Sequence, residues 1–427
     1  MDTTPDRRPV PGPDASPTAD SARASGHSSG SGSGSGSGFT PAERARGRAL
    51  RRAQLPWALG GRLAGLALTL LLGLTPAGAA LVTATGGWFG GSRTATVLAG
   101  AAALVVLGQV LQLPFGAGVR AVRARYGLVS QGWSGWALDG LRGLALALVL
   151  FLPLALGLFT LTAWSPQHWW LPAAGAAVVL TIALSFLHPL LIEPVFNRFT
   201  PMPPGEQRTA LLALAERDGV RVRDVLIADA SRRTTALNAY VSGFGATRRI
   251  VAYDTLLTAA EPREVELVVA HELGHVKHRD VALGTALGAV GAAAAVAVLG
   301  LLGSWQPLLD AAGATGPADP RALPLLVALA ALLGALSGPA QCAVSRRIEA
   351  RADRHALELT GDAEQFVAMQ RRLALVNVSD VDPPRLLELL FATHPSATRR
   401  IAAARTWQAA RGRPTPEQRT SPGGSVV

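Results

Sequence analysis

The stretch that decides the fold reads Pro262-Arg-Glu-Val-Glu-Leu-Val-Val-Ala-His-Glu-Leu-Gly-His-Val-Lys277, and an apolar stretch follows at 281–303. Pro262 suits the first turn of a helix, where no intrahelical N–H is required. Glu261 and Glu264 complement the positive end of the helix dipole. We therefore expect a helix that carries two histidines near its C-terminal end and stops at a membrane boundary.

The two histidines of this helix predict a metal site. His271 and His275 are four residues apart, so both imidazoles project from one helical face and can reach one ion. Glu272 between them is placed to take a proton from a zinc-activated water. Cys342 is the only cysteine, so histidine and carboxylate must hold the metal. The alternative is a chance match on a charged helix, which the adjoining membrane boundary and the polar run after His275 disfavour.

A third ligand is expected in the stretch Ser345–Asp353, because a catalytic zinc site takes three protein ligands and leaves one position open. Glu349 and Asp353 share one helical face at i and i+4 spacing. Glu349 can therefore bind the metal while Asp353 accepts a hydrogen bond from a ligand imidazole. Standing alone, the segment would fit a solvated charged helix better. The two preceding apolar stretches form a hairpin, however, which returns it to the side of His271.

The composition is that of a membrane protein. Hydrophobic residues make up 49% of the chain and charged residues only 16%, against about 25% charged in soluble domains. Trp88, Trp164, Trp169, Trp170 and Trp305 lie near the ends of apolar stretches, where interfacial aromatics belong. A bilayer span takes about 20 helical residues, and the sequence has such stretches near 57–83, 95–116, 143–163, 171–192, 281–303 and 322–344.

The arginines predict the orientation of these spans. The net charge is +11, and the arginines gather before the first stretch, between the second and third, and after the sixth. Because cytoplasmic loops carry the basic excess, both termini and the metal site are expected on the cytoplasmic side. No nucleic-acid-binding motif accompanies the charge, so we expect no nucleic-acid partner.

The predicted fold class is a mainly α-helical polytopic membrane protein, with about six transmembrane helices and a small α+β zincin-like metallopeptidase domain on the cytoplasmic side. A helix is expected over 205–218 and strands over 225–228, 238–242 and 250–253. The predicted organisation is a disordered basic tail (1–54), a four-helix membrane region (55–194), a first peptidase segment (195–280), a membrane hairpin (281–345), a second peptidase segment (346–408) and a disordered tail (409–427).

The chain resembles the membrane-embedded Ste24 group of M48 metallopeptidases, the type I CAAX prenyl proteases. The resemblance covers roughly residues 120–405 and rests on several motifs in one order. These are Tyr126–Gly132, Pro194–Pro201, Asn238–Tyr240, Arg249–Leu257, His271–His275, Ser345–Asp353 and His394–Ile401. The eukaryotic members have seven spans, so a chamber among the six expected here is predicted to be smaller or more open.

The resemblance implies further roles and one zinc ion per chain. Asn238, Ala239 and Tyr240 would line the substrate groove and pair with an extended peptide by strand addition. His394 would lie close to the zinc and help to stabilise the oxyanion. Arg400 would contact the substrate or its C-terminal carboxylate. From the residues alone, a His-Pro pair before a helix is more often a cap or a packed core residue.

Several alternatives remain at this point. The implied reaction is cleavage of a membrane-associated or prenylated CAAX-like substrate, but the Ala-, Gly- and Arg-rich composition indicates a bacterial cell membrane, where general peptide turnover is at least as plausible. A site-two-type protease would place its motif inside an apolar span, and a catalytically inert zinc-binding scaffold or sensor would usually lack Glu272. His278 and His355 are rival ligands for which structural roles are expected. The sequence leaves the oligomeric state open.

Overall fold

A computed structural model describes residues 38–411, and within that range residues 39–411 belong to one compact unit. Residues 1–37 and 412–427 of the two predicted tails (1–54 and 409–427) lie outside the described residues, and the prediction for 409–411 is wrong, because these residues end helix α15 (Ala397–Arg411). The remainder of the predicted N-terminal tail is wrong, because residues 41–54 form the first turns of helix α1 (Pro41–Gly73). Thr40 begins this helix with a capping box to Glu43. Leu50 then buries its side chain in a small apolar cluster, so the basic stretch is folded.

Six helices in the described part of the chain are long and apolar enough to cross a membrane, as predicted. The predicted span over 57–83 is interrupted, however. Pro76 lacks an N–H and starts a separate helix, α2 (Pro76–Gly87), whose first turn is capped by Thr75. The other membrane helices are α3 (Arg93–Arg125), α4 (Trp133–Trp164), α5 (Trp170–Leu187, continued by a π-helix at His188–Ile192 and by α6 at Glu193–Phe196), α10 (Asp280–Leu302) and α12 (Leu323–Thr360).

The tryptophans divide into two groups. Trp88, Trp164 and Trp305 are exposed, as an interfacial position requires. Trp169 is only 1% exposed and belongs to a buried cluster with residues of α3, α4 and α12. Its predicted interfacial position is therefore wrong, because the loop between α4 and α5 folds inward. Trp170 packs beside Gly300 of α10.

A four-stranded sheet lies beside the membrane helices. Its strands are β1 (Phe199–Pro201), β2 (Asp224–Ala228), β3 (Ala239–Ser242) and β4 (Arg249–Tyr253), in the order β1-β2-β4-β3. β2 and β4 run parallel, whereas β1 and β3 pair antiparallel with their single neighbours. The three predicted strands are confirmed and β1 is additional. β3 is an edge strand, so one row of its backbone groups is unpaired within the sheet.

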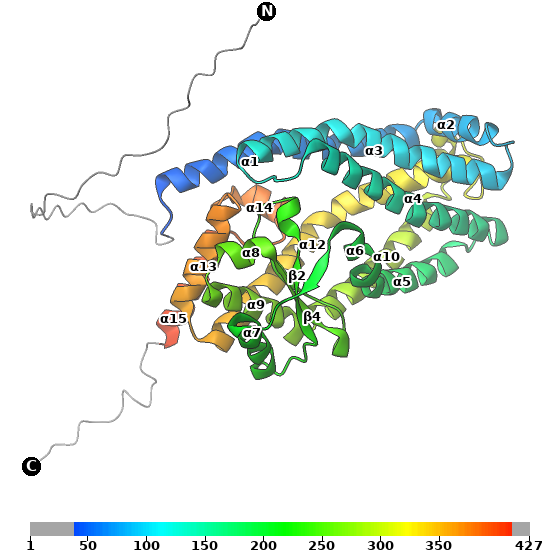
Figure 1. Cartoon of the computed structure of the whole chain (residues 1–427). Coiled ribbons are helices and arrows are strands. Elements are labelled where there is room, and N and C mark those ends of the chain that lie inside the picture. The colour runs from blue at the N-terminus through cyan, green and yellow to red at the C-terminus, as the bar shows by residue number, and fades with distance from the viewer. Residues whose placement is uncertain (1–37, 412–427) are drawn as a thin grey trace, which may run out of the picture. The chain divides into compact units, whose positions relative to one another are not determined.

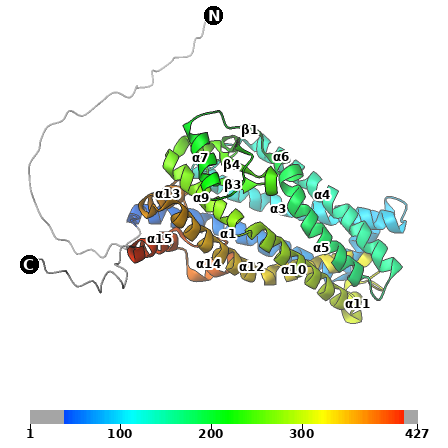
Figure 2. The same cartoon turned by 90° about the horizontal axis from the view of Figure 1, so that it is seen from below.

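Helix α9 (Pro262–Lys277) joins the sheet to the membrane hairpin. Pro262 is in its first turn, as predicted, and Glu261 is its N-cap residue. Gly274 allows α12 to approach closely, since a Cβ there would lie 3.1 Å from the Cβ of His355 and 3.2 Å from the Cα of Ala352. The predicted hairpin is confirmed, because α10 leaves α9 at Arg279 and α12 returns against α9. Figure 2 shows α10 and α12 running side by side.

The remaining elements pack around this centre (Figure 1). The helix predicted over 205–218 is α7, and the chain is helical again after the sixth span, as predicted. The elements not yet placed are α7 (Glu206–Arg217), α8 (Asp254–Ala259), α11 (Gln306–Ala312), α13 (Ala363–Val376), α14 (Arg385–Phe391), α15 (Ala397–Arg411) and 3₁₀ turns at Ala230–Arg232, Gly245–Thr247 and Pro320–Ala322.

Candidate metal centre

The three predicted metal ligands come together where α9 crosses α12. His271, His275 and Glu349 each offer one ligand atom, and these atoms all lie within 4.8 Å of one another. Nε2 of His271 is 3.3 Å from one carboxylate oxygen of Glu349, and Nε2 of His275 is 3.7 Å from the other. His271 and Glu349 are buried. Residues 74 or more apart in the chain thus meet because the membrane hairpin folds back.

The residues present fit a zinc ion. Within the described chain, Oε2 of Glu349 is buried without a hydrogen bond of acceptable geometry, although Nε2 of His271 and Nδ1 of His394 lie near it. A buried acceptor left in this state is costly unless a cation or a proton satisfies it. Two imidazole nitrogens and one carboxylate oxygen are the donor set of many catalytic zinc sites.

The orientation of His271 depends on two further side chains. Its Nδ1 lies 3.0 Å from a carboxylate oxygen of Asp353, the position predicted for Asp353 beside a ligand imidazole. Arg400 donates from Nε to the other oxygen of Asp353 at 2.8 Å, and its Nη2 contacts the same carboxylate. The Arg400 side chain is largely buried. Its observed partners are therefore Asp353 and, at 3.4 Å from Nη2, Nδ1 of His271, and contact with a substrate carboxylate remains a prediction.

His275 has an equivalent support that the sequence reasoning missed. Its Nδ1 lies 2.9 Å from Oδ2 of Asp280, and Arg351 donates to Oδ1 of the same buried carboxylate. Asp280 is five residues beyond His275, a spacing that does not share a helical face. The left-handed backbone of Arg279, with φ 55°, ends α9 and returns the chain toward His275. In the sequence, the only sign of this contact is that Asp280, an acidic residue, directly precedes the apolar stretch 281–303.

The surrounding residues shift the pKa values of Glu272, the proposed base, and of His271, a proposed ligand. Burial raises the pKa of Glu272 above the usual value of 4.5, with His271 and His275 opposing the shift. Burial alone would lower the pKa of His271, but the adjacent carboxylates of Asp353 and Glu349 outweigh burial and raise it to about 9. In the metal-free protein His271 is therefore held as the cation, where a metal would replace its proton.

The residues that the family resemblance singled out surround the cluster. His394 precedes α15, and its Nδ1 is 2.7 Å from Oε2 of Glu349, while its side chain is 59% exposed. It thus reaches the ligand cluster from the solvent side. The rival histidines belong elsewhere: Nε2 of His355 contacts Asp218 at 3.1 Å, and the ring of His278 packs against that of His355.

Two of the predicted groove residues, Ala239 and Tyr240, lie on the edge strand β3, which packs against α9, and Asn238 immediately precedes this strand. Asn238 is exposed, Ala239 is buried and Tyr240 is half-buried. The carbonyl of Asn238 accepts a hydrogen bond from the N–H of Tyr253. The hydroxyl of Tyr240 donates at 3.3 Å to Glu193, the first residue of α6, which continues the span of α5. β3 therefore contacts both α9, which carries the two histidines, and the membrane span that α5 and α6 form.

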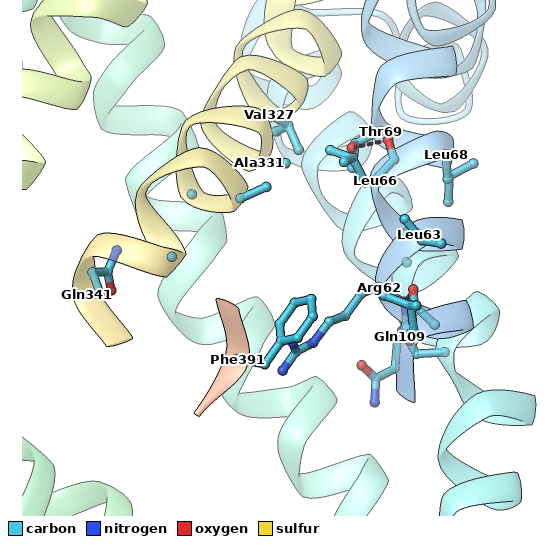
Figure 3. Close-up of a pocket in the computed structure, with 18 of the residues that line it drawn as sticks. Arg62, Leu63, Leu66, Leu68, Thr69, Gln109, Val327, Ala331, Gln341 and Phe391 are labelled. Carbon is cyan, nitrogen blue, oxygen red and sulfur yellow. Dashed lines mark hydrogen bonds between the residues drawn. The ribbon is translucent and has the colours of Figure 1, made fainter. Parts of the chain in front are cut away.

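A cavity of about 1250 Å³ opens among the membrane helices α1, α3 and α12 (Figure 3). Its lining is mainly apolar, and the guanidinium of Arg62 lies 5.1 Å from the ring centre of Phe391 inside it. Thr393, which precedes His394 in the chain, also lines it. The cavity thus extends along the spans to the segment that carries His394. The lining residues that Figure 3 labels are Arg62, Leu63, Leu66, Leu68, Thr69, Gln109, Val327, Ala331, Gln341 and Phe391.

Comparison with known proteins agrees with this arrangement. The sequence profile described as "Peptidase family M48" matches residues 206–408, which include every proposed metal ligand. The profile described as "CAAX prenyl protease N-terminal, five membrane helices" matches residues 40–198. That second region contains α1 to α5, five helices of which α2 has only 12 residues.

Individual relatives are similar over shorter stretches. An uncharacterized metalloprotease of Bacillus subtilis, YhfN, is 32% identical over 281 residues, which are 65% of this chain and 66% of that protein. A CAAX prenyl protease 1 homolog of Oryza sativa is 30% identical over 182 residues, 42% of this chain and 43% of that protein. The chain thus spans less than two thirds of the length of either relative.

A solved structure shows the same fold. The crystal structure of Ste24p from S. mikatae superposes with a TM-score of 0.75 at 20% sequence identity, and the match covers 86% of this chain and 90% of that one. The two profiles together account for the membrane helices and the metal-site segments. With six candidate spans and a fold of this kind, the protein is a multi-pass integral membrane protein, and it belongs to peptidase family M48 as a Ste24-like member.

Proposed function

We propose that this chain is a membrane-embedded zinc endopeptidase that hydrolyses peptide bonds of membrane-associated substrates. The observation that carries the proposal is the cluster of His271, His275 and Glu349, with Glu272 on the same helix and the edge strand β3 packed against it. The cluster has three protein ligands, which fits one zinc ion per chain and leaves a position for water or substrate.

The chain's own residues account for the other parts of the reaction. A zinc ion held there would act as a Lewis acid on the scissile carbonyl and would lower the pKa of a water molecule. Glu272 takes the proton of the attacking water and delivers it to the leaving amine as the C–N bond breaks. His394, beside Glu349, is placed to donate a hydrogen bond to the developing oxyanion. Water attacks the carbonyl directly, so no acyl-enzyme forms.

The edge strand aligns the substrate. In an antiparallel pair, alternate residues direct their backbone groups to the neighbouring strand. Since the carbonyl of Asn238 faces β4, those of Ala239 and Val241 face the free edge. An extended peptide can therefore add as a further strand and place its scissile bond over α9. This geometry favours a peptide substrate over a small-molecule amide.

The proposed substrate is a peptide segment of a lipidated or otherwise membrane-associated protein. The apolar cavity among α1, α3 and α12 reaches the residue that precedes His394, so an apolar group and a peptide could occupy neighbouring sites. Several relatives carry the name CAAX prenyl protease 1, which supports a prenylated C-terminal segment. Turnover of other membrane peptides uses the same machinery without the lipid.

We further propose a bacterial cell membrane as the location, with both termini and the metal site on the cytoplasmic side. The support is the distribution of arginines at the helix ends. Arg123 and Arg125 end α3, and Arg346 and Arg347 lie on α12 where it approaches α14. The metal cluster lies at that same end of α12, since Glu349 follows within one turn.

Cleavage of a quenched fluorescent peptide by detergent-purified protein tests this function. A prenylated and an unprenylated form of one peptide are compared before chelation, after chelation and after zinc is restored. The proposal expects cleavage that disappears on chelation and returns with zinc, and faster cleavage of the prenylated form. Zinc bound at one ion per chain with cleavage of neither peptide would favour a scaffold or sensor instead. Equal cleavage of both would remove the lipid requirement alone.

A further inference from the structure

Each of the two histidine ligands is held by an aspartate that is itself held by an arginine. Asp353 and Arg400 support His271, whose position beside an acidic residue was expected. Asp280 and Arg351 support His275 in the same way. The two pairs come from different elements, α12 with α15 for the first and α10 with α12 for the second. The second pair has no part in the function proposed above.

Asp280 is held in place by burial and by two polar contacts. Its side chain is only 5% exposed, and its two oxygens have separate partners, Nδ1 of His275 and the guanidinium of Arg351. Asp280 is the first residue of α10, and Arg279 before it has φ 55°, a conformation that side chains other than Gly, Asn and Asp rarely adopt. A tight turn thus returns a carboxylate to a histidine that helical spacing would not bring it near.

The contact decides which ring nitrogen of His275 faces the ligand cluster. An imidazole that donates its Nδ1–H to a carboxylate keeps the Nε2 lone pair free, and this is the nitrogen 3.7 Å from Glu349. Arg351 in turn pairs with the other carboxylate oxygen of Asp280 and holds it in one rotamer, since a buried carboxylate without a cationic partner is costly. Removing either residue would leave His275 free to rotate or to adopt the other tautomer.

We propose that Asp280 and Arg351 are positioning residues for His275 and set the affinity of the site for zinc. The inference rests on the proposed metal site and not on the proposed substrate. Asp280 begins one membrane helix of the hairpin, and Arg351 lies on the other, beyond its membrane part. The relative position of α10 and α12 therefore affects the geometry of the proposed metal cluster.

Zinc affinity measured by chelator competition on the full-length, detergent-purified chain tests this proposal without any substrate. We expect Asp280→Asn to weaken zinc binding about tenfold and Asp280→Ala up to about 100-fold, the usual range for residues that orient a ligand. Arg351→Gln should weaken binding less, and Arg351→Lys should keep most of the wild-type affinity, because a lysine ammonium can still pair with the Asp280 carboxylate. The matched control is Asp224→Asn, which breaks an aspartate–arginine pair at 2.9 Å on the sheet and should leave the affinity unchanged.

The outcomes separate a positioning role from a merely structural one. Wild-type zinc affinity in Asp280→Asn, with or without a lower unfolding temperature, would overturn the proposal. If the Asp280 variants do not fold, the Arg351 pair decides: equal affinity in Arg351→Gln and wild type overturns it, and a loss that Arg351→Lys repairs supports it. Failure of peptide cleavage in the wild type would remove the proposed function while leaving this result intact.

Discussion

At the scale of single residues, the proposed ligand His271 has a carboxylate beside each of its ring nitrogens. Asp353 lies 3.0 Å from its Nδ1 and Glu349 lies 3.3 Å from its Nε2. A carboxylate at each ring nitrogen stabilises the imidazolium against the opposing effect of burial, which is why the pKa of His271 rises to about 9 in the metal-free protein. Nε2 of His271 would have to lose its proton before it could bind a metal.

Zinc binding should therefore depend on pH. Because His271 must lose its proton on binding, the affinity should rise about tenfold per pH unit from 7 toward 9 and level off above the pKa of about 9. In the metal-free protein, the stabilisation that His271 contributes is complete below its ordinary pKa of 6.5 and is lost as the pH rises through about 9. Competition titrations with a chelator of known pH dependence measure the affinity. An affinity that is constant between pH 7 and 9 would show that His271 is neutral before binding.

At the scale of elements, the crossing of α9 and α12 holds the site together. Gly274 lies between the two metal-binding faces, and an added Cβ would meet His355 and Ala352 at 3.1 and 3.2 Å. The backbone atoms of Ala352 cannot move without displacing the helix that carries Glu349. The close approach of the two helices is therefore a condition for the three ligands to meet.

Substitution of Gly274 should separate these helices. We expect Gly274→Ala to cost about 1–3 kcal/mol through overpacking, despite the higher helix propensity of alanine, and to weaken zinc binding together with stability. Gly284→Ala on α10 is the control, because a Cβ there meets nothing within 4 Å. Thermal unfolding in detergent compares the two variants. An unfolding temperature for Gly274→Ala equal to that of the wild type would show that the helices have room to adjust.

The edge strand makes a separate prediction about the substrate. If a peptide pairs with the outward backbone groups of Ala239 and Val241, its own N–H groups at alternate positions must face β3. N-methylation at one of these positions should reduce kcat/KM about tenfold, the equivalent of one lost hydrogen bond. Methylation at the intervening residue serves as the control. Equal effects at both positions would argue against strand addition.

The sequence could predict the parts of the molecule that depend on local pattern. Six apolar stretches, three strands and the helix begun by Pro262 follow from periodicity and turn residues, and they are present in the structure. Glu349 could be proposed as a ligand because the hairpin between two spans fixes which side it returns to. The family resemblance added His394, whose contact with Glu349 no spacing rule could have indicated.

Other features depend on long-range packing and were out of reach. Asp280 meets His275 only through the left-handed turn at Arg279. Trp169 is buried because α3 and α12 enclose the loop that carries it. Arg400 contacts Asp353 only because α15 packs against α12. In each case the partner lies on an element whose placement the one-dimensional pattern does not contain.

At the scale of the whole molecule, the membrane helices themselves carry part of the proposed metal site. Glu349 and Asp280 both lie on helices of the membrane hairpin, while the two histidines lie on the helix that precedes it. The cavity among α1, α3 and α12 extends along the spans to Thr393, beside His394. The edge strand β3 and the apolar cavity thus both adjoin the segments that carry His271, His275, Glu349 and His394.

The most direct test of the central claim is a comparison of Glu272→Gln with the wild type and with Glu266→Gln, a control on the same helix. Zinc content and the kcat of metal-dependent peptide cleavage are measured on the same preparations. We expect one zinc per chain in all three proteins, wild-type cleavage by Glu266→Gln, and a fall in kcat of at least about 100-fold in Glu272→Gln, the loss expected of a general base. Undiminished cleavage by zinc-loaded Glu272→Gln would contradict it.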